Sequence, residues 1–229
     1  MPKGERYVLE PEAVQLLEEY GIPYPVHGFA RDAEEAAGIA EELGFPVVLK
    51  VVSPDVPHKS DAGGVLVGLE DGVAVREGFG AIVGRVSRAM PGAQFEGVLV
   101  CKQAADGLEV IVGALEDETF GPSVMFGLGG IFTELLRDVA FRVAPLRRRD
   151  AEEMIREIQG YPMLSGARGQ APLDVEALVE LLLSVSQLVI DRREIRELDL
   201  NPVRVYEHGL LALDARMVMN MNSEGERAL

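Results

Sequence analysis

The segment that most constrains the fold is VVLKVVSPDVPHKSDAGGV, at residues 47–65. Two apolar runs flank a polar loop that contains glycines, and this pattern predicts two short strands joined by the loop. A lysine interrupts the first apolar run, and the loop carries a histidine, a second lysine, a serine and two glycines. The purely structural interpretation is a strand, an ordinary Gly-Gly turn and a second strand, without a binding site.

The same residue types also suit a polyphosphate-binding site. Glycines let backbone N–H groups approach phosphate oxygens, lysines supply positive charge, and an imidazole can accept a phosphoryl group. The segment is neither the dinucleotide fingerprint nor the GxxxxGK[ST] loop. On this interpretation His58 is the candidate phosphoryl acceptor, and the candidate phosphate-binding residues are Lys50, Lys59, Ser60, Gly63 and Gly64.

Charge and composition narrow the possible partners and the compartment. The formal net charge of −16 over 229 residues argues against non-specific nucleic-acid binding, so any phosphate site must be locally basic. Only four residues are lysines, and two of them lie within residues 47–65. A single cysteine, Cys101, excludes an internal disulfide and fits a reducing cytoplasm. The sequence has no apolar run of membrane-spanning length, and its charged start does not resemble a signal peptide.

Hydrophobic periodicity and turn signals predict a mixed α/β (α+β) fold with mainly antiparallel strand pairs. The strands at 97–104 and 108–114 are expected to form a hairpin through Ala105-Asp106-Gly107, near the point where two lobes meet. A polar tail without regular structure is expected from Asn220. Helices are predicted at 10–20, 32–43, 73–90, 150–159 and 174–190, and further strands around Lys50 and at 65–69, 125–131, 138–144, 195–200 and 210–215.

The C-terminal segment ELDLNPVRVYEHGLLALDAR suggests a metal site. If Glu207-His208 forms a two-residue hairpin turn, Asn201 lies directly opposite Asp214, and Asp199 lies on the same strand face as Asn201. Carboxylate and amide oxygens are ligands that Mg²⁺ accepts alongside nucleotide phosphates. The alternative is an Asx-type turn at Asn201-Pro202 with exposed acids. Arg216 is then either an ion-pair partner or a phosphate contact, and the sequence does not choose between them.

Glu109 and the glycines of the FGLGGIF segment each have a functional and a structural interpretation. Glu109 interrupts an apolar strand and either points to solvent or accepts hydrogen bonds from a ribose. The glycines of FGLGGIF, at positions 127, 129 and 130, either let a ligand or partner approach the backbone or form a bulge or tight turn. Glu134 follows as a carboxylate with no evident partner.

Taken together, these motifs resemble the ATP-grasp β subunit of the nucleoside-diphosphate-forming (ADP-forming) acyl-CoA and acetyl-CoA synthetases. They are similar, more distantly, to the β subunit of succinyl-CoA synthetase. The resemblance extends to about Arg216. The stretches that carry it are YGIPYP (20–25), GFPVVLKVVSPDVPHKSDAGGV (44–65), GLEVIVG (107–113), FGPSVMFGLGGIFTELLRDVAFRVAPL (120–146), and ELDLNPV with ALDAR near the end.

The resemblance implies an ATP-grasp fold in which two lobes with largely antiparallel sheets clasp ATP or ADP with Mg²⁺. It implies an N-terminal lobe over residues 1–100 with a glycine-rich lid, a C-terminal lobe over 101–219 with the metal site, and a polar tail over 220–229. The implied roles are phosphate contact for Lys50, the lid for 58–65, the adenine hinge for Cys101, Lys102 and Gln103, ribose contact for Glu109, magnesium ligation for Asn201 and Asp214, an acid near the phosphohistidine for Asp199, and a phosphoryl relay for His58.

The resemblance also implies a partner. The chain contains no CoA-binding Rossmann domain, so an α subunit carrying the CoA-binding and CoA-ligase domains is expected. The joint reaction would be acyl-CoA + ADP + phosphate ⇌ acid + CoA + ATP, in the cytoplasm. The alternatives are a non-catalytic nucleotide-binding subunit that regulates a partner, and the β subunit of a succinyl-CoA-type ligase.

Overall fold

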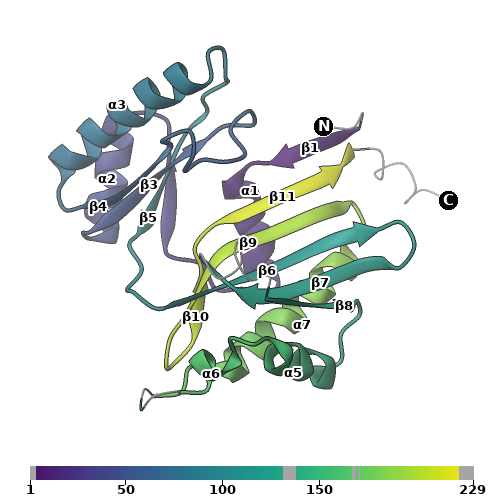
Figure 1. Ribbon diagram of the computed structural model, residues 1–229. Coiled ribbons are helices and arrows are strands. Elements are labelled where there is room, and N and C mark those ends of the chain that lie inside the picture. Colours follow the sequence, from purple (N-terminus) through teal and green to yellow (C-terminus); the bar gives the residue numbers. More distant parts are fainter. Residues whose placement is uncertain (1–3, 131–137, 167–168, 170, 222–229) are drawn as a thin grey trace. The chain divides into compact units, whose positions relative to one another are not determined.

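The computed structural model describes residues 4–130, 138–166, 169 and 171–221 (Figure 1). The chain forms two compact units. The smaller unit comprises residues 9–12 and 25–105, and the larger unit comprises the described parts of residues 1–8, 13–24 and 106–229. The assignment of residues 1–100, 101–219 and 220–229 to two ATP-grasp lobes and a tail stays a prediction.

The smaller unit is a four-stranded sheet with two helices on it. The strand order is β2 (His27–Ala30), β5 (Gly97–Lys102), β3 (Val47–Val52) and β4 (Val65–Leu69). Helices α2 (Ala33–Leu43) and α3 (Gly72–Ala89) cover one face of this sheet (Figure 1). Both helices begin at an aspartate N-cap: Asp32 accepts the N–H groups of Glu34 and Glu35, and Asp71 accepts that of Ala74.

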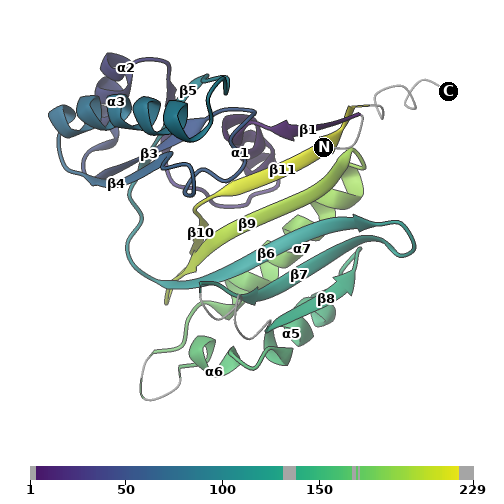
Figure 2. The same ribbon diagram turned by 45° about the horizontal axis from the view of Figure 1, so that its top comes forward.

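The larger unit is a seven-stranded sheet. Its main path runs β1 (Glu5–Val8), β11 (Ala215–Asn220), β9 (Ile195–Val205), β6 (Leu108–Asp117), β7 (Gly121–Leu128) and β8 (Val139–Val143), and β10 (Leu210–Ala212) pairs with β9. Its described helices are α5 (Arg148–Glu157), α6 (Tyr161–Leu164), α7 (Val175–Asp191) and most of α1 (Glu10–Glu19). Figure 2 shows α5 and α7 behind this sheet.

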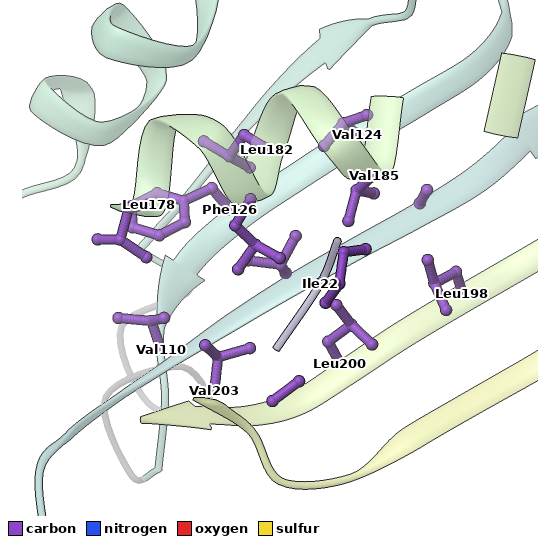
Figure 3. Close-up of a cluster of buried hydrophobic side chains, with 14 of the residues drawn as sticks. Ile22, Val110, Val124, Phe126, Leu178, Leu182, Val185, Leu198, Leu200 and Val203 are labelled. Carbon is purple, nitrogen blue, oxygen red and sulfur yellow. The ribbon is translucent and has the colours of Figure 1, made fainter. Parts of the chain in front are cut away.

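The core of the larger unit lies between α7 and the sheet. Figure 3 shows Leu178, Leu182 and Val185 of α7 pointing towards Phe126 of β7 and the apolar side chains of β9. Phe126 is fully buried. This packing fixes which face of β9 is apolar, so the polar residues that alternate along β9 occupy the other face.

The structure confirms most predicted elements and corrects others. The five predicted helices are present within a few residues, and every strand pairing among the described residues is antiparallel. The hairpin between 97–104 and 108–114 was wrong, because β5 pairs with β2 and β3 and the chain leaves the smaller unit after Ala105. Strands β1 and β2 were missed, and the start of the expected tail belongs to β11. Glu134 and the tail from residue 222 lie outside the described residues.

The structure also bears on the predicted absence of a membrane segment. Across the described ranges, the helices are too short or too polar to span a lipid bilayer.

Candidate functional site

The smaller unit contains a buried cluster of two lysines and one glutamate. Lys50 lies on β3, whose other residues are all apolar, and it is only 6% exposed. Its Nζ donates a hydrogen bond to Glu10 Oε1 at 2.8 Å, and Lys59 Nζ lies 3.3 Å from Glu10 Oε2. The structure therefore brings together the two lysines predicted to bind phosphate, through an acid at the start of α1.

The glycine-rich loop is held by hydrogen bonds within itself. Ala62 N–H donates to His58 O, Gly63 N–H to Ser60 O and Gly64 N–H to Lys59 O, at 3.3, 3.0 and 2.7 Å. Contact between phosphate and the Gly63 and Gly64 amides would require these bonds to open. The loop nevertheless needs both glycines, because Gly63 has a φ of +67° and a Cβ on Gly64 would lie 2.4 Å from Val51 Cγ1.

His58 and Ser60 are exposed at the surface of this loop. His58 directly precedes Lys59, and its carbonyl accepts the first of the hydrogen bonds that close the turn. An exposed imidazole can meet a reactant that arrives from another chain, whereas the side chain of Lys50 is buried, that of Lys59 is largely covered, and both are ion-paired with Glu10.

The predicted adenine hinge lies at the end of β5. Cys101 is buried, at 2% exposure. Lys102 N–H donates to Val26 O and Gln103 N–H donates to Pro46 O, so these two amides are already used within the smaller unit. The side chains of the same two residues also bond locally, with Lys102 Nζ donating to the carbonyls of Gly44 and Phe45 and Gln103 Oε1 accepting Gly68 N–H.

In the larger unit, the structure confirms the register predicted for the C-terminal hairpin. Strand β9 pairs with β10 and then with β11 in the same register. Leu210 of β10 lies opposite Val205, and Val218 of β11 lies opposite Glu197. In that register Asn201 lies opposite Asp214. Asn201 and Pro202 together face the single residue Ile111 of β6, which is the spacing of a β-bulge within β9. The Asx-type turn at Asn201-Pro202 stays an alternative.

This arrangement fits a magnesium ion that also takes phosphate ligands. Opposed residues of an antiparallel pair project to the same face, so this register predicts that an amide oxygen from Asn201 and a carboxylate from Asp214 lie close together. Within the described ranges, no group of three or more His, Cys, Asp or Glu side chains could hold a metal by itself. Mg²⁺ is commonly bound through one or two carboxylates with substrate phosphates and water completing the shell, so two protein ligands suffice.

Asp199 lies opposite Arg216 on the face of β9 that carries Asn201. Arg216 Nη2 is 3.5 Å from Glu197 Oε1, and its guanidinium lies over the Tyr7 ring at 5.2 Å from the centroid. These contacts favour the ion-pair interpretation of Arg216 over the phosphate contact.

Glu109 pairs across the sheet with Arg204, whose Nε and Nη2 both donate to Glu109 Oε1 at 3.1 Å. The side chain of Glu109 remains 36% exposed. It therefore does not simply point to solvent, and a contact with ribose stays a prediction.

Gly127 and Gly129 of FGLGGIF allow strands to approach closely. A Cβ on Gly127 would lie 2.7 Å from Val139 Cγ1, and one on Gly129 would lie 2.9 Å from the Glu109 carbonyl carbon. Gly130 has a φ of +66°. Close packing and a turn therefore account for all three glycines.

The comparisons with known proteins bear on the family. A model described as an ATP-grasp domain matches residues 1–219. The β subunit of acetate–CoA ligase [ADP-forming] I from Pyrococcus furiosus is 48% identical over 214 residues, covering 93% of this chain and 92% of that one. Acetate–CoA ligase [ADP-forming] I from Archaeoglobus fulgidus is 49% identical over 212 residues, but the match spans only 31% of its length. A succinate–CoA ligase β subunit from Ignicoccus hospitalis is 26% identical over 227 residues, covering 94% of this chain and 56% of that one.

Solved structures of an acetyl-coenzyme A synthetase point to the same family as the sequence comparisons. Acetyl-coenzyme A synthetase 1 of Ca. Korarchaeum cryptofilum, in complex with coenzyme A, Ca-AMPCP and HgCl+, has a TM-score of 0.91 and 48% identity, covering 93% of both chains. The same enzyme with coenzyme A and Mg-AMPPCP, its phosphohistidine segment pointing towards the nucleotide-binding site, has a TM-score of 0.81 and 44% identity, again covering 93% of both. This chain therefore belongs to the ATP-grasp family, among the β subunits of the ADP-forming acetyl-CoA synthetases.

Proposed function

We propose that this chain binds ATP or ADP with magnesium and passes a phosphoryl group through His58, as the β subunit of an ADP-forming acyl-CoA synthetase. The observation that carries the proposal is the loop of the smaller unit, where an exposed histidine directly precedes one of two lysines clustered on Glu10. The reaction is acyl-CoA + ADP + phosphate ⇌ acid + CoA + ATP, and a partner α subunit supplies CoA binding and acyl chemistry.

In the transfer step, an imidazole nitrogen of His58 takes the phosphoryl group from a phosphohistidine of the partner. An oxygen of the ADP β-phosphate then attacks the phosphorus, the N–P bond breaks, and ATP forms. Neutral imidazole is a good nucleophile near pH 7. Lys50 and Lys59 stabilise negative charge on the transferring group, which is where most of the catalysis of a loose transition state arises.

The remaining assignments divide between the units. In the smaller unit, Ser60, Gly63 and Gly64 line the phosphates, and the end of β5 at Cys101 and Gln103 contacts adenine. In the larger unit, Glu109 contacts the ribose and Asp199 lies beside the phosphohistidine. Asn201 and Asp214 would hold Mg²⁺, which when bound neutralises charge on phosphate oxygens.

The test is phosphorylation of the protein by γ-labelled ATP and Mg²⁺, alone and with its α subunit. We expect a base-stable, acid-labile phosphate that is lost in His58→Ala. The chain has three histidines, so His208→Ala is a matched control that should keep the label. Tight Mg-ATP binding without any label, even with the α subunit present, would instead support the regulatory subunit.

A further inference from the structure

We propose that Glu10 is a positioning residue: its carboxylate holds the ammonium groups of Lys50 and Lys59 together so that both face one polyphosphate. The inference rests on the proposed function, in which the two lysines bind nucleotide phosphates. Glu10 itself acts only through the lysines.

The contacts use both oxygens of one carboxylate. Oε1 accepts from Lys50 Nζ at 2.8 Å, and Oε2 lies 3.3 Å from Lys59 Nζ. The Glu10 side chain is 1% exposed, against 8% and 10% for the side chains of Lys50 and Lys59. What surface remains therefore belongs mainly to the lysines, and a phosphate would meet them before the acid.

Charge explains why such a residue is needed. Two ammonium groups that converge on one phosphate repel each other, and burying either alone is costly. One carboxylate between them offsets part of that penalty, and these three side chains by themselves still carry more positive than negative charge, which attracts a polyphosphate.

The position of Glu10 in the chain suits this role. It is the first residue of α1, where the helix dipole favours an ionised carboxylate. Its backbone is fixed by the helix, whereas each lysine ends a flexible four-carbon stem. The first turn of α1, which belongs to the smaller unit, therefore holds the carboxylate from which Lys50 and Lys59 receive their orientation.

The first experiment measures nucleotide affinity by calorimetry in Glu10→Gln, with Glu18→Gln as the control. Glu18 is an exposed glutamate of the same helix, so its variant removes the same charge elsewhere. We expect ADP and ATP to bind about tenfold more weakly to Glu10→Gln, while adenosine is affected less than about twofold. A role limited to folding would weaken all three ligands alike. ADP binding that is unchanged or tighter in Glu10→Gln would overturn the proposal, because it would mean that Glu10 is neutral or competes with phosphate.

A second measurement does not depend on nucleotide. The described lysines are Lys50, Lys59 and Lys102, and Lys102 Nζ is bonded to the carbonyls of Gly44 and Phe45. Amine-reactive labelling followed by mass spectrometry should show Lys50 and Lys59 becoming reactive in Glu10→Gln while Lys102 stays protected. The variant Glu10→Asp, which keeps the charge but shortens the reach, should expose Lys59 more than Lys50, because Lys59 has the longer contact. Equal labelling in all proteins would contradict the proposal.

The two experiments separate the failure of the positioning role from the failure of the proposed function. If the unaltered protein binds ATP and is phosphorylated at His58 but Glu10→Gln behaves identically, only the positioning role is wrong. If the unaltered protein binds no nucleotide, the proposed function is wrong, and the labelling of the lysines still decides whether Glu10 holds them.

Discussion

Gly64 offers a direct test of why the loop after β3 contains a glycine. A Cβ at this position would lie 2.4 Å from Val51 Cγ1 and 3.0 Å from the Lys59 carbonyl oxygen. We expect Gly64→Ala to destabilise the smaller unit by about 1–3 kcal/mol, the usual cost of overpacking. Val51 is fully buried, so Val51→Ala should cost about 2 kcal/mol from two lost methyl groups and a small cavity.

The double variant distinguishes a steric explanation from any other. Val51→Ala removes the nearest atom that Gly64→Ala would meet, Val51 Cγ1, and leaves the milder contacts with Lys59 O and Val51 Cβ at 3.0 and 3.1 Å. The new methyl group then fills part of the space left by Val51. The double variant should therefore lose only about 2 kcal/mol, which makes it more stable than the sum of the single variants by about 1–3 kcal/mol. Urea denaturation followed by circular dichroism measures the free energies, and hydrogen exchange over residues 47–69 assigns the change to this unit. Additivity within about 0.5 kcal/mol would refute the reasoning.

Three further predictions concern the larger unit. Phe126→Ala should cost about 3–5 kcal/mol in urea denaturation because the ring is fully buried; a loss below about 1 kcal/mol would contradict this core. A double-mutant cycle between Glu109→Gln and Arg204→Ala should give a coupling of about 0.2–1 kcal/mol that falls with added salt, since the pair is partly exposed. Hydrogen bonds from the N–H group of Gly209 and then from that of Ala177 lower the pKa of Asp174 in the folded protein. The ionised Asp174 therefore stabilises the fold fully above the ordinary pKa of about 3.9, and this contribution is lost as the pH falls through the lowered pKa of the folded state. Asp174→Ala should therefore cost about 1 kcal/mol at pH 7 and less at each step below pH 4, and a constant difference would refute the linkage.

Features set by neighbouring residues were predictable from the sequence. The caps Asp32 and Asp174 each bond to an N–H group within three residues, so the starts of their helices could be placed. The register that sets Asn201 opposite Asp214 follows from one tight turn between β9 and β10, and counting outward from the turn was enough.

Features that depend on residues far apart in the sequence could not be predicted from it. The turn signal at Ala105-Asp106-Gly107 indicated a hairpin, yet β5 takes its partners from β2 and β3. Strand β1 is four residues long and pairs with the far end of the chain through β11, so its short sequence carries little signal. Glu10 looked like an ordinary start of a helix, because nothing local connects it with a lysine forty residues away.

The most direct test of phosphoryl transfer through His58 is the discharge of the labelled protein. The protein is phosphorylated with γ-labelled ATP, together with its α subunit where that is needed, freed of nucleotide, and mixed with ADP and Mg²⁺. The account predicts that label leaves His58 and appears in ATP, with none formed when ADP is omitted. Label that stays on the protein, or is released as inorganic phosphate in the presence of ADP, would contradict it.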